Sequence, residues 1–203
     1  MSRVVVITGA SAGVGRATAR RFGAKHAIEG FTETLRTELL HDGSHVDVTL
    51  VQLPAHNTPQ FSWGRTKMPE HPQPVPPIFQ PEVAADAIFH AAHRPRKEFW
   101  VGWPTAKAIL AERVAPKIGD RYLAKTGFQS QQTEPALAQD RPGNLFEPPP
   151  GDPGAHGDFD EQAKSRSWLW WANANRERVG LATGAAGALV AAAVLSARNG
   201  RGH

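Results

Sequence analysis

A glycine-rich turn near the start of the chain has residue types that bind phosphate. The segment Thr8-Gly9-Ala10-Ser11-Ala12-Gly13-Val14-Gly15 directly follows the apolar run Val4-Val5-Val6-Ile7. An apolar strand, a glycine turn and a helix start allow backbone N–H groups to approach a dinucleotide pyrophosphate. Glycine is needed there because a Cβ atom would block the approach. The alternative is an ordinary strand–turn–helix corner with the same spaced glycines.

Two later segments also carry clear patterns. Residues 24–39 form a helical pattern that begins with Ala24-Lys25-His26. Residues 46–53 are β-branched and apolar, which predicts a strand, and Pro54-Ala55-His56-Asn57-Thr58 follows as a turn.

In chain order these three segments resemble the short-chain dehydrogenases/reductases, and the resemblance covers residues 1 to about 125. It implies a truncated Rossmann-like three-layer α/β domain, with NAD or NADP as cofactor and hydride transfer to or from a hydroxyl or carbonyl substrate. The family's turn has glycine where this chain has Ala55. The resemblance also implies the cofactor contacts Thr8, Gly9, Ser11, Ala12, Gly13, Val14, Gly15, Pro54 and Thr58.

The catalytic residues of that family are mostly missing. The family uses a Tyr-x-x-x-Lys pair and a separate serine, and Lys25 matches the lysine. Arg21 occupies the tyrosine position, and a guanidinium cannot lose a proton at working pH. The only tyrosine is Tyr122, far along the chain. The sequence therefore predicts impaired catalysis, and the alternative for Lys25 is a solvated helix lysine.

An internal deletion near Gly23 explains these gaps, because the end of one family helix there runs directly into the middle of another. Residues 14–41 could then form one fused helix that ends near Asp42-Gly43. Two strands that separate the first strand from residues 46–53 in the family are absent. The sheet must either pair anew or fray, since buried N–H and C=O groups need partners. The residue that distinguishes NAD from NADP is also missing, so the cofactor preference is unreadable.

The segment from Pro54 to Pro81 is a proline-rich loop. Its aromatic residues Phe61, Trp63 and Phe79 could line a substrate pocket or anchor the loop to the core. After it we predict a helix from Pro81 that ends before Pro95, a strand over residues 98–103, a helix over residues 105–114 and a short turn through Tyr122.

Composition limits the class of protein. The chain has 203 residues, 40% of them hydrophobic, and no cysteine, which fits one modest domain with appendages. The net charge of +4 is dispersed and does not predict nucleic-acid binding. His90 and His93 share a helical face but have no third ligand at metal-binding spacing, so no metal is predicted.

Three parts are predicted along the chain: a domain over residues 1–127, a disordered Pro/Gly-rich linker over 128–165 and a C-terminal part over 166–203. Residues 179–197 carry no charge and follow an aromatic cluster at Trp168–Trp171. This predicts a transmembrane helix, with the domain at the cytoplasmic face of a membrane. The alternative is an alanine-rich helix that does not cross a membrane. The functional alternatives to an oxidoreductase are a non-catalytic membrane-anchored nucleotide-binding protein and a deletion product without function.

Overall fold

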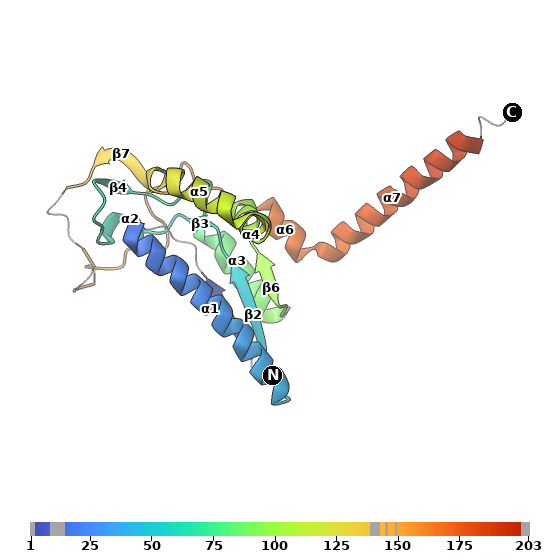
Figure 1. Cartoon of the computed structure of the whole chain (residues 1–203), viewed down its shortest axis with the longest axis horizontal. Helices are drawn as coiled ribbons and strands as arrows, with labels where there is room; N and C mark the ends of the chain where they lie inside the picture. Colours follow the sequence, from blue (N-terminus) through green and yellow to red (C-terminus); the bar gives the residue numbers. More distant parts are fainter. Residues whose placement is uncertain (1–2, 9–14, 139–142, 145, 149, 200–203) are drawn as a thin grey trace.

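A parallel three-stranded sheet lies at the centre of the computed structural model, which describes residues 3–8, 15–138, 143–144, 146–148 and 150–199. The strands β1 (Arg3–Thr8), β2 (Asp47–Gln52) and β6 (Glu98–Trp100) lie in the order β1-β2-β6 (Figure 1). Thr8 is opposite Gln52, and Gln52 is opposite Trp100. All three strands therefore end at the same edge of the sheet.

The first strand, β1, pairs directly with β2. β1 hydrogen-bonds along its whole length to β2 in parallel, from Arg3 opposite Asp47 to Thr8 opposite Gln52. Of the two expected outcomes, pairing anew is confirmed. On its other side, β2 pairs with β6 over Leu50–Gln52, so this half of β2 is hydrogen-bonded on both sides.

The predicted fused helix is confirmed as α1, which runs without interruption over Gly15–His41, 27 residues. It ends where a Schellman motif satisfies its last carbonyl groups: Gly43 N donates to Leu40 O at 3.2 Å and Ser44 N donates to Leu39 O at 2.9 Å. Gly43 has a φ of 64°, a left-handed conformation that glycine adopts without a Cβ penalty.

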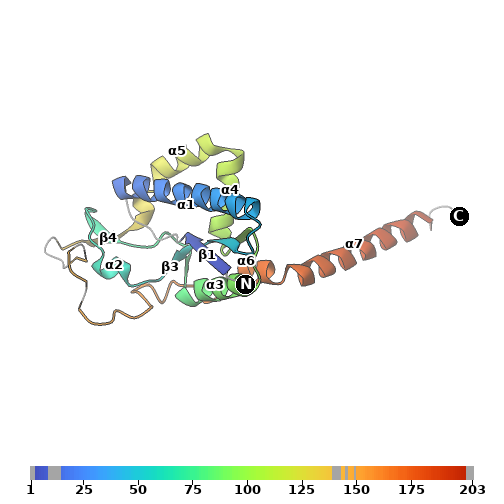
Figure 2. The same cartoon turned by 90° about the horizontal axis from the view of Figure 1, so that it is seen from below.

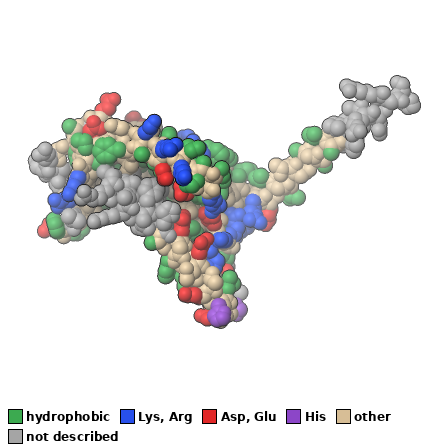
Figure 3. All heavy atoms as spheres, viewed as in Figure 1, with side chains coloured by type: hydrophobic (Ala, Val, Ile, Leu, Met, Phe, Trp, Pro, Cys, Tyr) green, Lys and Arg blue, Asp and Glu red, His purple; other side chains and the backbone are tan. Residues whose placement is uncertain are grey.

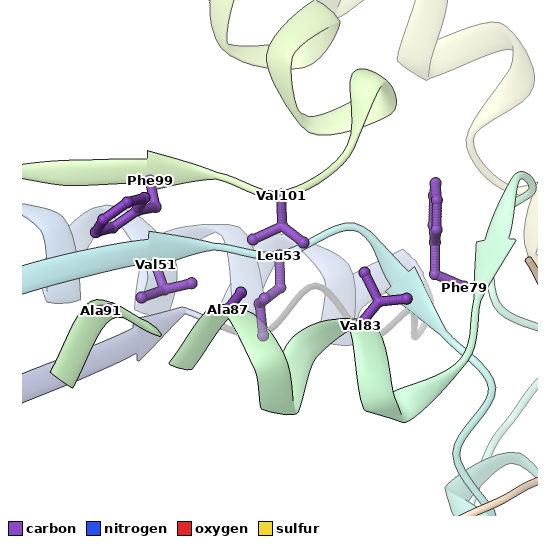
Figure 4. Packing of buried hydrophobic residues seen from close by; sticks show 8 residues of the cluster. All are labelled: Val51, Leu53, Phe79, Val83, Ala87, Ala91, Phe99 and Val101. Atoms are coloured by element: carbon purple, nitrogen blue, oxygen red, sulfur yellow. The ribbon is translucent and has the colours of Figure 1, made fainter. Parts of the chain in front are cut away.

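Helices cover both faces of the sheet, as the predicted three-layer α/β domain requires. Figure 2 shows α1 on one side of the strands and α3 (Pro81–His93) on the other. On the α1 side, the Gln52 side chain donates to Glu29 Oε1 at 2.6 Å. On the α3 side lies the main hydrophobic core (Figure 4), formed by Val51, Leu53, Phe79, Val83, Ala87, Ala91, Phe99 and Val101. The predicted helix from Pro81 that ends before Pro95 is confirmed.

The proline-rich segment folds into short elements packed against this domain. It contains β3 (Ala55–His56), α2 (Gln60–Trp63), β4 (Glu70–Pro72) and β5 (Ile78–Phe79), and β3 pairs in parallel with β5. Phe61 and Phe79 are buried, with 3% and 5% of their surface exposed, whereas Trp63 is half-buried. Phe61 and Phe79 thus anchor the segment, the second of the two roles considered for them.

The prediction of a disordered linker over residues 128–165 is wrong for the stretches that the structure describes. After the 3-10 turn at Gln129–Gln131, β7 (Gln132–Ala136) pairs antiparallel with β4. Farther on, Phe159 is buried, and its ring meets that of Phe61 edge-on with centroids 5.9 Å apart. Proline and glycine exclude helix here, but they do not prevent pairing at an edge or the burial of one aromatic ring.

Four helices account for most of the remaining chain. The predicted helix at residues 105–114 is α4 (Trp103–Val114), and the predicted turn through Tyr122 is instead a second helix, α5 (Pro116–Thr126). The helix α6 (Trp168–Ala174) packs against β6: the Ser167 hydroxyl donates to Val101 O, and the Trp170 ring meets Phe99 edge-on. The last helix, α7 (Arg176–Asn199), projects away from the body (Figure 1).

The predicted span at residues 179–197 lies within α7. No helix among the described residues is long and apolar enough to cross a membrane. The structure does not support the transmembrane prediction.

Candidate functional site

The candidate site is the edge of the sheet at which all three strands end. The glycine-rich turn leaves β1 directly after Thr8, and α1 begins at Gly15. Residues 9–14, which include Gly9, Ser11, Ala12, Gly13 and Val14, lie outside the described residues. A parallel strand followed closely by the N-terminus of a long helix is the arrangement that a phosphate-binding turn needs, and the cofactor contacts of the turn stay a prediction.

The second predicted segment opens at the same edge. Pro54 lies two residues beyond the end of β2 and is buried. A Cβ atom at Gly102, which follows β6, would lie 2.8 Å from Pro54 Cγ. The segments after β2 and β6 therefore touch each other at a point that only glycine allows. The sheet thus brings Thr8, Gly15 and Pro54 to one edge.

A later segment covers the turn that contains Thr58. A Cβ atom at Gly157 would lie only 2.5 Å from Thr58 O. Gly157 N also donates to Asn57 O at 3.3 Å, and Phe159 N donates to the Asn57 side-chain oxygen at 3.0 Å. The Asn57 side chain is fully buried and donates to Asp160 Oδ1 at 2.8 Å. Asn57 therefore fixes the covering segment over the turn.

His56 is a candidate residue that the sequence analysis did not single out. Its side chain is buried, with 6% exposed, and burial lowers the pKa of its imidazole, against a backbone hydrogen bond to Pro54 that raises it. Its Nε2 atom has no hydrogen-bond partner in the part of the chain that the structure describes. The signal that could have identified His56 and Asn57 was their position directly after a buried strand, where side chains collect at the sheet edge.

The catalytic prediction rests on α1. Lys25 and Arg21 lie one helical turn apart in α1, and their side chains lie outside the described residues. Tyr122 lies in α5 and is 66% exposed, in an element that packs on α4. The role of Lys25 therefore stays a prediction, and the described residues do not place a tyrosine hydroxyl beside it.

An acid–base cluster on the surface joins the covering segment to α3. His156 Nε2 lies 2.7 Å from Glu82 Oε1, and His156 Nδ1 lies 3.3 Å from Asp160 Oδ1. The hydrogen bond to Glu82, followed by that to Asp160, raises the pKa of His156. We call these three residues the His156 clasp. The described residues contain no group of three or more His, Cys, Asp or Glu side chains placed to hold a metal ion.

The two histidines of α3 have different surroundings. The His90 ring meets Phe99 and Trp170 edge-on, at centroid distances of 5.6 and 5.3 Å. His93 is exposed, and its Nδ1 atom lies 2.8 Å from the carbonyl oxygen of Phe89 one turn earlier. His90 therefore belongs to the contact between α3 and α6.

Comparison with known proteins gives a partial match. The chain is similar to the uncharacterized oxidoreductase YxnA of Bacillus subtilis (strain 168), with 31% identity over 114 residues. The match covers 55% of this chain and 32% of YxnA, so the chain spans about a third of the length of that relative. No protein-family model matches the chain, and no solved structure matches it significantly. The similarity is thus to an oxidoreductase over about half of the chain.

Proposed function

We propose that the chain is a truncated short-chain dehydrogenase/reductase that binds NAD or NADP through the glycine-rich turn and lacks hydride transfer. One observation carries this proposal. The strands β1 and β2 end in register, with Thr8 opposite Gln52, so the glycine-rich turn and the turn at Pro54–Thr58 open at one edge. Parallel α/β sheets bind ligands at this edge. The similarity to an oxidoreductase supports the same class.

Binding in this proposal depends on the pyrophosphate. Backbone N–H groups of the turn and the N-terminus of α1 hold a dianionic group, with no need for the catalytic residues. In this proposal Thr58 and Pro54 lie beside the nicotinamide. Gly157 packs on Thr58 and Gly102 packs on Pro54, and neither glycine has room for a Cβ atom. The residue that normally reads the ribose 2′ position is missing, so NAD and NADP bind with similar affinity.

The absence of turnover follows from the proton transfer. Hydride transfer to a carbonyl needs an acid that delivers a proton to the developing alkoxide, and the family's tyrosine supplies it. Arg21 stays charged at working pH and cannot do so. Without the family's tyrosine, Lys25 has no phenol hydroxyl whose pKa it could lower.

The test is calorimetric titration of the full chain with NADH and NADPH. The variant Gly13→Val places a β-branched side chain in the glycine-rich turn and should abolish binding. The matched control is Gly30→Val, because Gly30 lies on the exposed face of α1 with nothing within 4 Å of a Cβ atom. Equal affinity of both variants would show that the turn is not the site. Separately, NAD(P)-dependent turnover that disappears in Lys25→Ala would contradict the loss of catalysis.

A further inference from the structure

A pocket lies at the end of the sheet opposite the candidate site, where β6 begins. It has a volume of about 470 Å³ and lies between the loop that joins α3 to β6 and the junction of α6 with α7. Figure 3 shows Lys and Arg side chains gathered where α7 leaves the body. The pocket is lined by His90, Arg94, Arg96, Asn173, Arg176 and Arg178, among others.

The pocket concentrates positive charge. Four arginines line it against one carboxylate, Glu177. Among the described residues, no carboxylate lies within salt-bridge distance of any of these four guanidinium groups. Burial, and then the charge of Arg176, lowers the pKa of Arg96. Folding therefore brings like charges together, and within the described part of the chain no carboxylate forms a salt bridge with them.

The geometry holds one of these arginines in place. Arg96 is half-buried, and its guanidinium carbon lies 3.8 Å from the centre of the Phe99 ring. Its Nη2 atom donates to Asn173 O at 3.2 Å, which ties the loop before β6 to the end of α6. A stacked guanidinium keeps free N–H groups that can point at an anion.

The start of α7 adds backbone donors. Near the start of this helix, Val179 N donates to Asn175 O at 3.0 Å, and the N–H groups of residues 176–178 have no acceptor within the helix. These residues line the pocket. The positive end of a 24-residue helix thus faces the same space as the four arginines.

We propose that this pocket binds a phosphate group, held by Arg94, Arg96, Arg176 and Arg178 and by the N-terminus of α7. Arginine matches the geometry of phosphate oxygens, and a helix N-terminus favours a dianion. The phosphate belongs either to a small soluble molecule or to a lipid headgroup. The site is independent of the proposed dinucleotide site, because the two lie at opposite ends of the sheet.

The experiment has two arms, both on the full chain. In the first, calorimetry measures affinity for inorganic pyrophosphate. In the second, flotation measures binding to phosphatidylcholine vesicles with and without phosphatidic acid. The test variant is Arg94→Gln with Arg178→Gln, which spares the stacked Arg96. The control is Lys117→Gln with Arg121→Gln, which removes the same charge from exposed positions on α5.

The test variant should lose affinity on the order of tenfold or more, and the control should keep it. Loss in the pyrophosphate arm identifies a soluble phosphate, and loss in the vesicle arm alone identifies a lipid headgroup. Binding in neither arm, or equal loss in both double variants, overturns the proposal.

A second readout comes from His90. Burial, and then the charges of Arg94, Arg96 and His93, lowers the pKa of His90. A bound anion offsets the arginines, so pyrophosphate or phosphatidic acid should raise this pKa in an NMR titration. Binding that leaves the His90 pKa unchanged overturns the assignment to this pocket.

Discussion

Glycine at position 102 has a packing reason that a sequence pattern does not reveal. A Cβ atom there would lie 2.8 and 2.9 Å from two carbon atoms of the Pro54 ring, and position 102 is buried. The rigid ring cannot swing aside as a flexible side chain would. The contact ties the ends of β2 and β6 together beside the proposed dinucleotide site.

We expect Gly102→Ala to destabilise the chain by about 1–3 kcal/mol, the usual cost of overpacking a buried contact. Urea unfolding followed by tryptophan fluorescence measures this. Weaker NADH binding should accompany the loss of stability, because Pro54 moves. A variant as stable as the parent would show that Pro54 and position 102 are farther apart than described.

The His156 clasp makes stability depend on pH. Because Glu82 and Asp160 raise the pKa of His156, the protonated imidazole is favoured in the folded chain. The stabilisation is fully present below the unfolded pKa of about 6.5 and is lost as the pH rises through the higher folded pKa.

The measurement is the difference in unfolding free energy between the parent chain and His156→Gln. That difference should be larger at pH 5.5 than at pH 9. A difference that is constant across this range would mean that His156 is not held by the two carboxylates.

At the scale of elements, α1 is one continuous helix across Gly23. Helical spacing continues across Gly23, and the structure keeps one helix over Gly15–His41. Burial along α1 does not simply follow the apolar residues, because Phe31 is 63% exposed whereas Thr32 is fully buried. The Thr32 hydroxyl donates to Ile28 O at 2.6 Å, which satisfies it without a partner on the sheet.

Two glycines of this element should respond in opposite directions. Gly30→Ala should stabilise by about 0.5–1 kcal/mol, since an exposed helix position gains propensity and a Cβ atom there meets nothing within 4 Å. Gly43→Ala should destabilise by about 1 kcal/mol, because its φ of 64° strains an L-residue. Thermal unfolding by circular dichroism compares the two. Destabilisation by Gly30→Ala would mean that α1 is interrupted there.

The sequence predicted the elements with local signals and missed those that depend on distant partners. Pro81 at a helix start and β-branched residues at 46–53 are local, and α3 and β2 follow them. The strand β7 has no such signal: it contains Pro135 and exists because β4 offers an edge. The same holds for Asn57, whose partners Phe159 and Asp160 lie about a hundred residues away.

At the scale of the whole molecule, the two C-terminal helices contribute differently to stability. The helix α6 closes over the core through Trp170 and Ser167. In α7, by contrast, Leu181, Leu189 and Val190 are 64–76% exposed, and among the described elements the main packing partner of α7 is the neighbouring α6.

We therefore expect truncation after Asn175 to leave the urea midpoint of the body nearly unchanged. Truncation after Arg166 should lower it clearly, because Phe99 and His90 then lose their aromatic cover. Equal midpoints for the two truncated chains would contradict the packing of α6.

The position of α6 in the chain also bears on how the protein is made. Trp170 and Ser167 complete a core whose other members begin at Val51, and Phe159 seals the segment at Phe61. A ribosome releases the chain from its N-terminus, so β1, β2 and β6 emerge long before the segment that covers them. For that interval the apolar side chains between α3 and β6 are exposed to other nascent chains. We expect a chaperone that binds the first 130 or so residues during synthesis to raise the soluble yield. A chaperone that binds only the released chain should not raise it.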